Sequence, residues 1–202
     1  TTHKTTSLQN SLLSARLHDP FSYLGVHREK GRTLVRVFRP HDVNVWIRTT
    51  IGYEPMSRIH ANGIFDLRGE FPPEMPYRLR IEAKGDTQSV YETYDAYAFP
   101  LQIADHDVYL FNEGKLRQAY RMLGAQRVRN SGVDGVRFSV WAPNAGRVSV
   151  VGDFNRWDGR IHPMAVHHAS GVWELFIPDL PPNAVYKYEI RNRDSGEIVL
   201  KT

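Results

Sequence analysis

Apolar and polar residues alternate along many short stretches of the chain. Between residues 136 and 140, three apolar residues alternate with Arg137 and Ser139, and aromatic or aliphatic residues alternate with charged ones between residues 186 and 191. A period of two residues predicts strands that bury one face. Glycines and prolines separate these stretches, as expected where turns connect strands.

The chain contains an internal repeat, which predicts two structurally related modules. Thr33–Pro40 and Val136–Pro143 each combine an alternating strand, an aromatic residue and a proline two residues later, 103 residues apart. The same features then follow in both halves: a glycine two residues before an aromatic residue (Gly63 and Gly171), a Pro-Pro pair (Pro72–Pro73 and Pro181–Pro182) and a Tyr-led strand (Tyr77–Ile81 and Tyr186–Ile190).

These patterns predict an all-β fold of two tandem immunoglobulin-like β-sandwiches joined by a short helical connector. A short helix is expected over Ser7–Leu17. A second is expected over Asn112–Leu123, where Asn112 suits an N-cap and Gly124 a C-terminal stop. The expected boundaries are an N-terminal extension over 1–18, a first module over 19–111, a connector over 112–131 and a second module over 132–202.

Composition narrows the possible functions. With 202 residues and 41% hydrophobic content, two modules can each bury a core. The absence of cysteine excludes disulfides and fits a cytoplasmic location. The 26 basic residues are dispersed among 22 acidic ones, so no nucleic-acid partner is expected. No apolar run approaches the roughly 18 residues that cross a membrane, so no membrane partner is expected either.

The polar residues do not predict an active site or a metal centre. Asp153 and Asp158 flank a Phe-Asn-x-Trp element, but the preference of aspartate for turns explains both more simply than an acid/base pair does. His162, His167 and His168 lie close in sequence without a helical ligand spacing. We therefore expect no catalytic residue, no metal ligand and no cofactor in this chain.

The second repeat resembles carbohydrate-binding modules of family 48, and closely those of bacterial glycogen branching enzymes. The segments that carry this resemblance are Gly135–Ala145, Val148–Arg160, His162–Met164, Ser170–Pro178 and Tyr186–Glu189. Debranching enzymes and trehalohydrolases are the alternative origin, but they usually lack Trp157–Arg160 followed by His162–Met164.

The first repeat resembles the extra N-terminal module of longer bacterial branching enzymes. Asp19–Phe21 and Leu24–His27 resemble the start of that module, and Tyr94–Phe99 and Asp107–Gly114 its exit. Asp95–Tyr97 reads Asp-Ala-Tyr where family members commonly read Asp-Pro-Tyr, a difference that concerns turn geometry.

The resemblance implies non-catalytic modules of an enzyme that forms α-1,6 branches by transferring α-1,4-glucan chains. The chemistry of that family takes place in a (β/α)8 barrel of at least about 200 residues, which we expect elsewhere in the same polypeptide. The modules are expected to bind glycogen or maltooligosaccharide, to position it and to influence the length of chain transferred. One alternative is that they only brace the barrel and bind no sugar; another is protein scaffolding through exposed sheet edges.

The resemblance also implies candidate site residues. Trp157 lies in a polar turn and matches a tryptophan that stacks on glucose, Lys187 matches a lysine that donates to sugar hydroxyls, and Asn155 completes the candidate glucan site. The alternative for Trp157 is packing against the barrel or across the end of the sandwich.

Other tryptophans suggest contacts of a different kind. Trp46 and Trp141 lie opposite the apolar faces of their strands. Together with Arg160 they are candidates for interdomain contact, although local packing is the alternative for Trp141. Trp173 shares its phase with Leu175 and is expected in the core.

Overall fold

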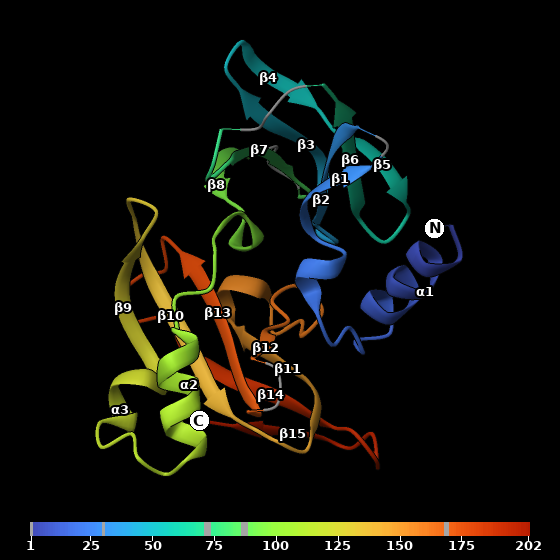
Figure 1. Ribbon diagram of the computed structural model, residues 1–202. Coiled ribbons are helices and arrows are strands. Elements are labelled where there is room, and N and C mark those ends of the chain that lie inside the picture. Colours follow the sequence, from blue (N-terminus) through green and yellow to red (C-terminus); the bar gives the residue numbers. More distant parts are fainter. Residues whose placement is uncertain (1, 30, 71–73, 86–88, 168–169) are drawn as a thin grey trace. The chain divides into compact units, whose positions relative to one another are not determined.

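The computed structural model describes residues 2–29, 31–70, 74–85, 89–167 and 170–202, so Pro72–Pro73 and His168 lie outside the described residues. The chain forms two compact units, the small unit (Tyr23–Phe99) and the large unit (Thr1–Ser22 with Pro100–Thr202) (Figure 1). Both units consist mainly of antiparallel strands, so the predicted all-β class is confirmed.

The small unit has two four-stranded sheets, ordered β1-β2-β6-β5 and β4-β3-β7-β8. This is the order of an immunoglobulin sandwich with one additional strand. The strands are β1 (Gly25–Glu29), β2 (Arg32–Phe38), β3 (Asp42–Thr49), β4 (Gly52–Pro55), β5 (Ser57–His60), β6 (Ile64–Gly69), β7 (Arg78–Ala83) and β8 (Val90–Tyr94), followed by the 3-10 turn η2 (Ala96–Ala98).

A buried ion pair crosses the first sheet of the small unit. The guanidinium of Arg36 in β2 donates through Nε and Nη2 to the two carboxylate oxygens of Asp66 in β6, at 2.7 and 2.8 Å. The same guanidinium lies 4.3 Å from the ring centre of Tyr23. The two parallel hydrogen bonds offset the free-energy cost of removing both charges from water. Because Arg36 lies opposite Asp66, the pair favours this register of β2 with β6.

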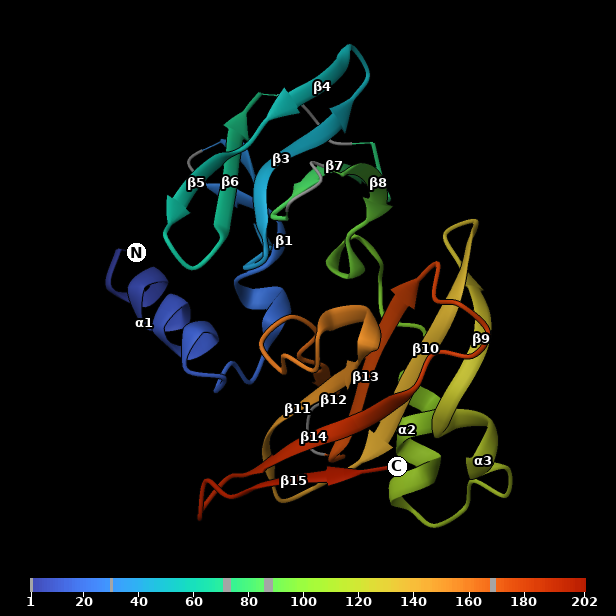
Figure 2. The same cartoon turned by 180° about the vertical axis from the view of Figure 1, so that it is seen from behind.

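The large unit has a four-stranded sheet, β12-β13-β10-β9, and a three-stranded sheet, β11-β14-β15. This order again matches an immunoglobulin sandwich. Figure 2 shows β11, β14 and β15 side by side. The ring of Phe138 in β10 lies 4.9 Å from that of Tyr186 in β14, edge to face, and so joins the two sheets. The strands are β9 (Gly124–Asn130), β10 (Val133–Trp141), β11 (Ala145–Gly152), β12 (Ala165–His167), β13 (Val172–Pro178), β14 (Tyr186–Asn192) and β15 (Ile198–Lys201).

The structure corrects the predicted connector over 112–131. Gly124–Asn130 is the strand β9, which pairs with β10 from Asn130 opposite Val133 to Gly124 opposite Ser139. This segment therefore belongs to the sandwich. Arg127 and Arg129 are exposed while Val128 between them is half-buried, as expected for an edge strand with one exposed face.

The helix predicted over Asn112–Leu123 is also wrong in its position. The structure has α2 (Asp105–Asn112) and the short α3 (Ala119–Met122), so α2 ends at the residue that was expected to begin the helix. Gly114 follows the helix with a φ of 68°, and its N–H bonds the carbonyl of Phe111 at 3.0 Å. A glycine in the left-handed region is a typical helix stop.

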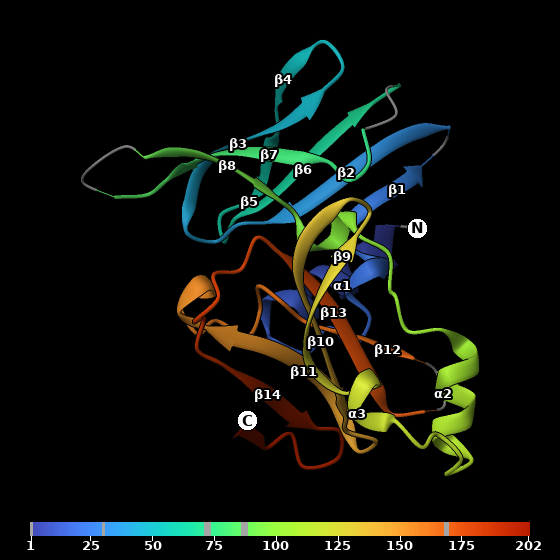
Figure 3. The same cartoon turned by 90° about the vertical axis from the view of Figure 1, so that its left-hand side faces the viewer.

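Strand β13 is buried on both faces along its whole length, whereas β10 is buried at Phe138 and Ser139; Figure 3 shows α2 and α3 near these strands. Val172 packs with Ile103, Val108 and Met122 in an apolar cluster. Ser139, expected to face outward, is only 1% exposed and donates to the carbonyl of Met122. Alternation reports the pleat of a strand but not what covers each face.

Glu174 in β13 holds the segment that precedes α2. Its side chain is fully buried and accepts hydrogen bonds from the backbone N–H groups of Gln102, at 2.6 Å, and Ile103, at 3.2 Å. His167 Nε2 lies 2.7 Å from the same carboxylate. The carboxylate therefore joins β12, β13 and residues 102–103 within the large unit.

The N-terminal segment belongs to the large unit. The helix α1 (Thr2–Leu13) begins and ends earlier than the Ser7–Leu17 expected, and η1 (Pro20–Ser22) follows. Between them, the carbonyl of Ala15 accepts a hydrogen bond from Arg191 Nε at 3.2 Å, and His18 Nδ1 bonds the carbonyl of Gly146 at 2.8 Å. Residues 15–18 are thus tied to the sheet of β11 and β14.

Candidate functional site

The candidate glucan residues gather in the turn after β11, called here the Trp157 turn (Gly152–Gly159). Its backbone begins at Gly152, where a Cβ would overlap the carbonyl oxygen of Val185. The 3-10 turn η3 (Asp153–Asn155) follows, and both Arg156 and Trp157 have a positive φ, 55° and 59°. Two successive left-handed residues are costly for side chains other than glycine, so surrounding bonds must hold this turn.

Asn155 provides several of those bonds. Its side chain is 3% exposed, and its Oδ1 accepts from the N–H of Gly152 at 2.9 Å. Its Nδ2 donates to the carbonyl of Val150 at 2.8 Å and lies 2.9 Å from His162 Nδ1. The amide therefore closes the turn from inside, and a direct contact between Asn155 and glucan stays a prediction.

Trp157 is held at both its backbone and its ring. Its N–H bonds the carbonyl of Gly152 at 2.9 Å, and its indole Nε1 donates to Asp153 Oδ1 at 2.8 Å. The side chain is nevertheless 39% exposed. The turn thus presents an oriented aromatic surface. The sequence pattern does not predict that Asp153 holds the indole ring. The spacing of four residues within a compact turn is the signal that could have revealed it.

A buried cluster fastens the end of the Trp157 turn to the sheet. Arg147 Nη1 donates to Ser149 Oγ at 2.5 Å and to the carbonyl of Gly159 at 2.6 Å. Its Nη2 binds the carboxylate of Glu189, and Arg147 is only 1% exposed. The sequence pattern predicts neither Arg147 nor Glu189 in this role, because their pairing depends on the register of β11 with β14.

Lys187 lies in β14, directly opposite Val151 in the strand register. Its neighbours Tyr186 and Tyr188 both contact Phe138 in the core, so alternation directs Lys187 to the other face of the sheet. The end of the Trp157 turn meets that face, because the carbonyl of Gly159 accepts from Arg147 and Arg147 pairs with Glu189, which shares the strand phase of Lys187. A joint contact of Lys187 and Trp157 with glucan stays a prediction.

Arg160 forms a close pair with Asp158 just after the turn. Its Nε and Nη2 lie 2.9 and 2.7 Å from the two carboxylate oxygens. This hydrogen bonding raises the pKa of Arg160 above its usual value, so the guanidinium stays charged. Its side chain is 30% exposed, and the predicted interdomain contact stays a prediction.

The other tryptophans have different surroundings. Trp173 is 1% exposed, which confirms its expected place in the core. Trp46 pairs with Arg80 across β3 and β7, between Val45 and Ile47, which are buried. Its predicted contact with another domain stays a prediction.

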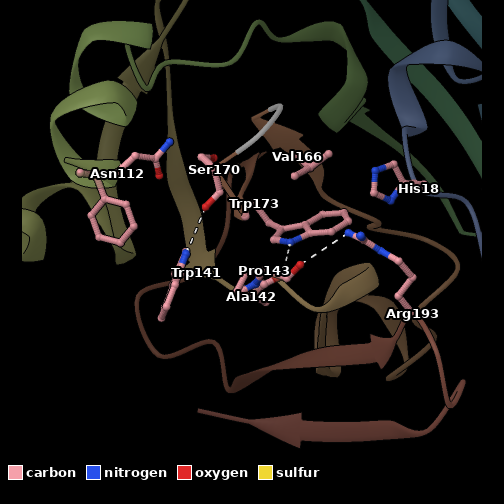
Figure 4. A pocket seen from close by; sticks show the side chains of 11 residues that line it. His18, Asn112, Trp141, Ala142, Pro143, Val166, Ser170, Trp173 and Arg193 are labelled. Carbon is pink, nitrogen blue, oxygen red and sulfur yellow. Dashed lines mark hydrogen bonds between the residues drawn. The ribbon is translucent and has the colours of Figure 1, made fainter. Parts of the chain in front are cut away.

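Trp141 is 54% exposed, and its indole Nε1 donates to the carbonyl of Ser170 at 3.1 Å. It lines a pocket of about 550 Å³ in the large unit (Figure 4). This position, too, leaves its predicted interdomain contact as a prediction.

Two of the three histidines that lie close in sequence, His162 and His167, have separate partners. His162 lies beside Asn155, and His167 pairs with Glu174. Within the described parts of the chain, no group of three His, Cys, Asp or Glu residues could hold a metal ion. Nor is any helix in those parts long and apolar enough to cross a membrane.

Two family models match separate parts of the chain. Residues 5–97 match the family described as alpha-1,4-glucan branching enzyme GlgB, N-terminal domain. Residues 122–202 match Carbohydrate-binding module 48 (Isoamylase N-terminal domain). The chain belongs to the GlgB branching-enzyme family and matches its N-terminal part. The resemblance inferred from the sequence is confirmed.

GlgB relatives match nearly the whole chain. The 1,4-alpha-glucan branching enzyme GlgB of Nitrosospira multiformis is 62% identical over 195 residues, covering 96% of this chain and 26% of that protein. GlgB of Nitrosomonas europaea is 62% identical over 196 residues, covering 97% of this chain and 26% of that protein. The chain therefore spans about a quarter of the length of these curated relatives.

A solved structure that matches part of this chain is ligand-free PulA from Klebsiella pneumoniae. It is 17% identical, with a TM-score of 0.34, over 88% of this chain and 19% of that chain. A TM-score this low supports no comparison of their sites.

Proposed function

We propose that the chain forms the non-catalytic N-terminal modules of a branching enzyme and that the large unit binds α-1,4-glucan at Trp157. A (β/α)8 barrel elsewhere in the polypeptide transfers the glucan chain to form an α-1,6 branch, in the cytoplasm and without a cofactor. The observation that carries this proposal is an exposed tryptophan ring fixed by its turn. The family match to a carbohydrate-binding module supports it.

The physical basis is the fit between a flat aromatic ring and the apolar face of glucose. If one sugar ring covers about 50 Å² of the indole, burial contributes about 1.3 kcal/mol, or about tenfold in affinity. Because the ring of Trp157 is already held by Asp153, little side-chain entropy is lost on binding. Lys187 on the same face supplies a donor for sugar hydroxyls.

Asn155 supports this site from beneath. Its amide fixes the turn from which the ring projects, so it acts here as a positioning residue. A glucan chain held at a fixed place on the module reaches the barrel in a restricted orientation and at a restricted distance from its end. In this way the modules position the donor and influence the length of chain transferred.

Affinity electrophoresis in gels that contain glycogen tests the proposal. The wild-type chain should be retarded, and Trp157→Ala should weaken binding about tenfold. Lys187→Ala should weaken binding less, because a lysine on an exposed face only exchanges hydrogen bonds to water for hydrogen bonds to sugar. Tyr120→Ala is the matched control, because it removes an aromatic side chain that is 66% exposed in α3, away from the Trp157 turn.

The bracing alternative gives the opposite result. If the modules only support the barrel, the wild-type chain migrates at the same rate with and without glycogen. Trp157→Ala would then change the stability of the full-length enzyme but not the migration of this chain. A wild-type chain that is retarded while Trp157→Ala is retarded equally would remove Trp157 from the site.

A further inference from the structure

The large unit has a pocket at the end of β11 opposite to the Trp157 turn. The pocket of about 550 Å³ is built by the end of α2, the end of β10, the turn from β10 to β11 and the residues before β13. A neighbouring pocket of about 590 Å³ shares Asn112 and Val166 with it. The two pockets therefore adjoin, and together they are called here the Trp141 groove.

Trp141 gives this groove its aromatic surface. It is the last residue of β10, and its indole Nε1 is bound to the carbonyl of Ser170 at 3.1 Å. The ring of Phe111 meets it edge to face, with centroids 6.1 Å apart. Trp141 is thus oriented from two sides and still 54% exposed, which is the same combination that Trp157 shows. Tyr109, which is 58% exposed, lines the adjoining half of the groove.

Polar side chains surround this aromatic surface. Figure 4 shows Asn112 and Trp141 on one side of the pocket and His18 and Arg193 on the other. Arg193 reaches the carbonyls of Pro143 and Ala145 only through Nη2, at 3.5 and 3.4 Å. A guanidinium has five N–H donors, so Arg193 can also donate to a ligand.

Among the described residues, no Asp or Glu lines the half of the Trp141 groove that contains Trp141. Asp19 and Asp105 line the adjoining half. A neutral amide and a cationic donor beside a tryptophan ring suit a neutral polyhydroxylated ligand. The carboxylates farther along the groove suit hydroxyl donors of the same ligand. A purely apolar partner would leave these polar groups without compensation.

We propose that the Trp141 groove is a second α-glucan site, in which Trp141 stacks on a sugar ring while Asn112 and Arg193 bond its hydroxyls. This inference rests on the proposed function, since it assigns the same ligand class to another place on the module. Strand β11 has eight residues, so it separates the two sites by roughly 23 Å. A long glucan chain that engages both sites binds by avidity, whereas a short one occupies them independently.

Calorimetric titration of the 202-residue chain with maltotriose and maltoheptaose tests this inference. The wild-type chain should bind two maltotriose molecules, and Trp141→Ala and Trp157→Ala one each. Trp141→Ala with Trp157→Ala together should bind none. Arg193→Ala removes an exposed side chain with two long bonds to carbonyls, so it should weaken the Trp141 site with little change in the melting temperature. Tyr120→Ala is again the control and should bind two.

The outcomes separate the two proposals. One maltotriose per wild-type chain, lost in Trp157→Ala and kept in Trp141→Ala and Arg193→Ala, overturns the second site and leaves the proposed function standing. One molecule lost in Trp141→Ala and kept in Trp157→Ala removes the Trp157 site and supports the groove. If neither variant changes a wild-type stoichiometry of two, or the wild-type chain binds nothing, the groove is not a glucan site. In the last case the contact of Trp141 with another domain becomes the better assignment.

Discussion

At the scale of single residues, the exposure of Trp157 follows from its backbone. Arg156 and Trp157 both have a positive φ. The side chain of Trp157 therefore does not follow the alternation of inward and outward positions that a strand imposes. The polar composition of Asn155–Gly159 allowed the sequence analysis to foresee a turn. The hydrogen bonds of Asp153 and Asn155 fix the ring. They depend on the folded turn, so the alternation of apolar and polar residues does not predict them.

Asn155→Ala tests whether the buried amide holds the Trp157 turn. The substitution leaves the N–H of Gly152 and the carbonyl of Val150 without their partner, so the large unit should lose about 2–3 kcal/mol. Urea unfolding followed by the indole N–H signal of buried Trp173 measures this loss. Asn183→Ala, at an exposed position, should cost less than about 0.5 kcal/mol. Equal losses in the two variants would contradict the role given to Asn155.

Asp95 in the small unit predicts a dependence of stability on pH. Burial raises the pKa of Asp95, which accepts a hydrogen bond from Tyr77 Oη. A raised pKa means that the folded chain binds the proton more tightly than the unfolded chain does. The stability that this provides is complete below about pH 4 and is lost as the pH rises through the folded pKa.

Asp95→Asn removes this titration and keeps an oxygen that can accept from Tyr77. Relative to the variant, the wild type should therefore become less stable as the pH rises above about 4. Urea unfolding at several pH values, followed by the indole signal of Trp46, the one tryptophan of the small unit, measures the difference. A difference that stays constant with pH would show that Asp95 does not titrate in this way.

At the scale of elements, strands were easier to predict from the sequence than helices. The strands around Phe138 and Tyr188 lie where alternation indicated them, because a pleated strand reports its buried face directly. The helix α2 was misplaced because Asn112 suits an N-cap in composition, while Gly114 two residues later in fact ends the helix. The burial of Ser139 could not be foreseen either, since it depends on helices that are distant in sequence.

Gly114→Ala tests this account of the end of α2. Nothing lies within 4 Å of a Cβ built at Gly114, so the expected cost of about 1 kcal/mol comes from the left-handed backbone alone. Gly114→Asn should cost less, since asparagine tolerates that conformation better. Urea unfolding followed by the Trp173 signal distinguishes the two variants. If Ala and Asn cost the same, the backbone conformation does not limit the substitution.

At the scale of the whole molecule, each unit contains its own strand framework, and the chain belongs to the N-terminal part of the GlgB family. The repeat in the sequence foresaw two related sandwiches, because both follow the same order of strand, proline turn and Tyr-led strand. It did not foresee that residues 15–18 are held by Arg191 and Gly146 of the large unit. Such contacts join residues more than 120 positions apart, beyond the reach of local patterns.

The most direct test of the central claim is a titration of the chain with maltoheptaose, followed by the indole N–H signals of its four tryptophans. The signal of Trp157 should shift progressively, because sugar stacking changes the local magnetic field at a ring held by Asp153. The signal of Trp46, which lies in the small unit, should stay in place. A Trp157 signal that does not move while glycogen retards the chain would contradict the account, because glucan would then bind elsewhere.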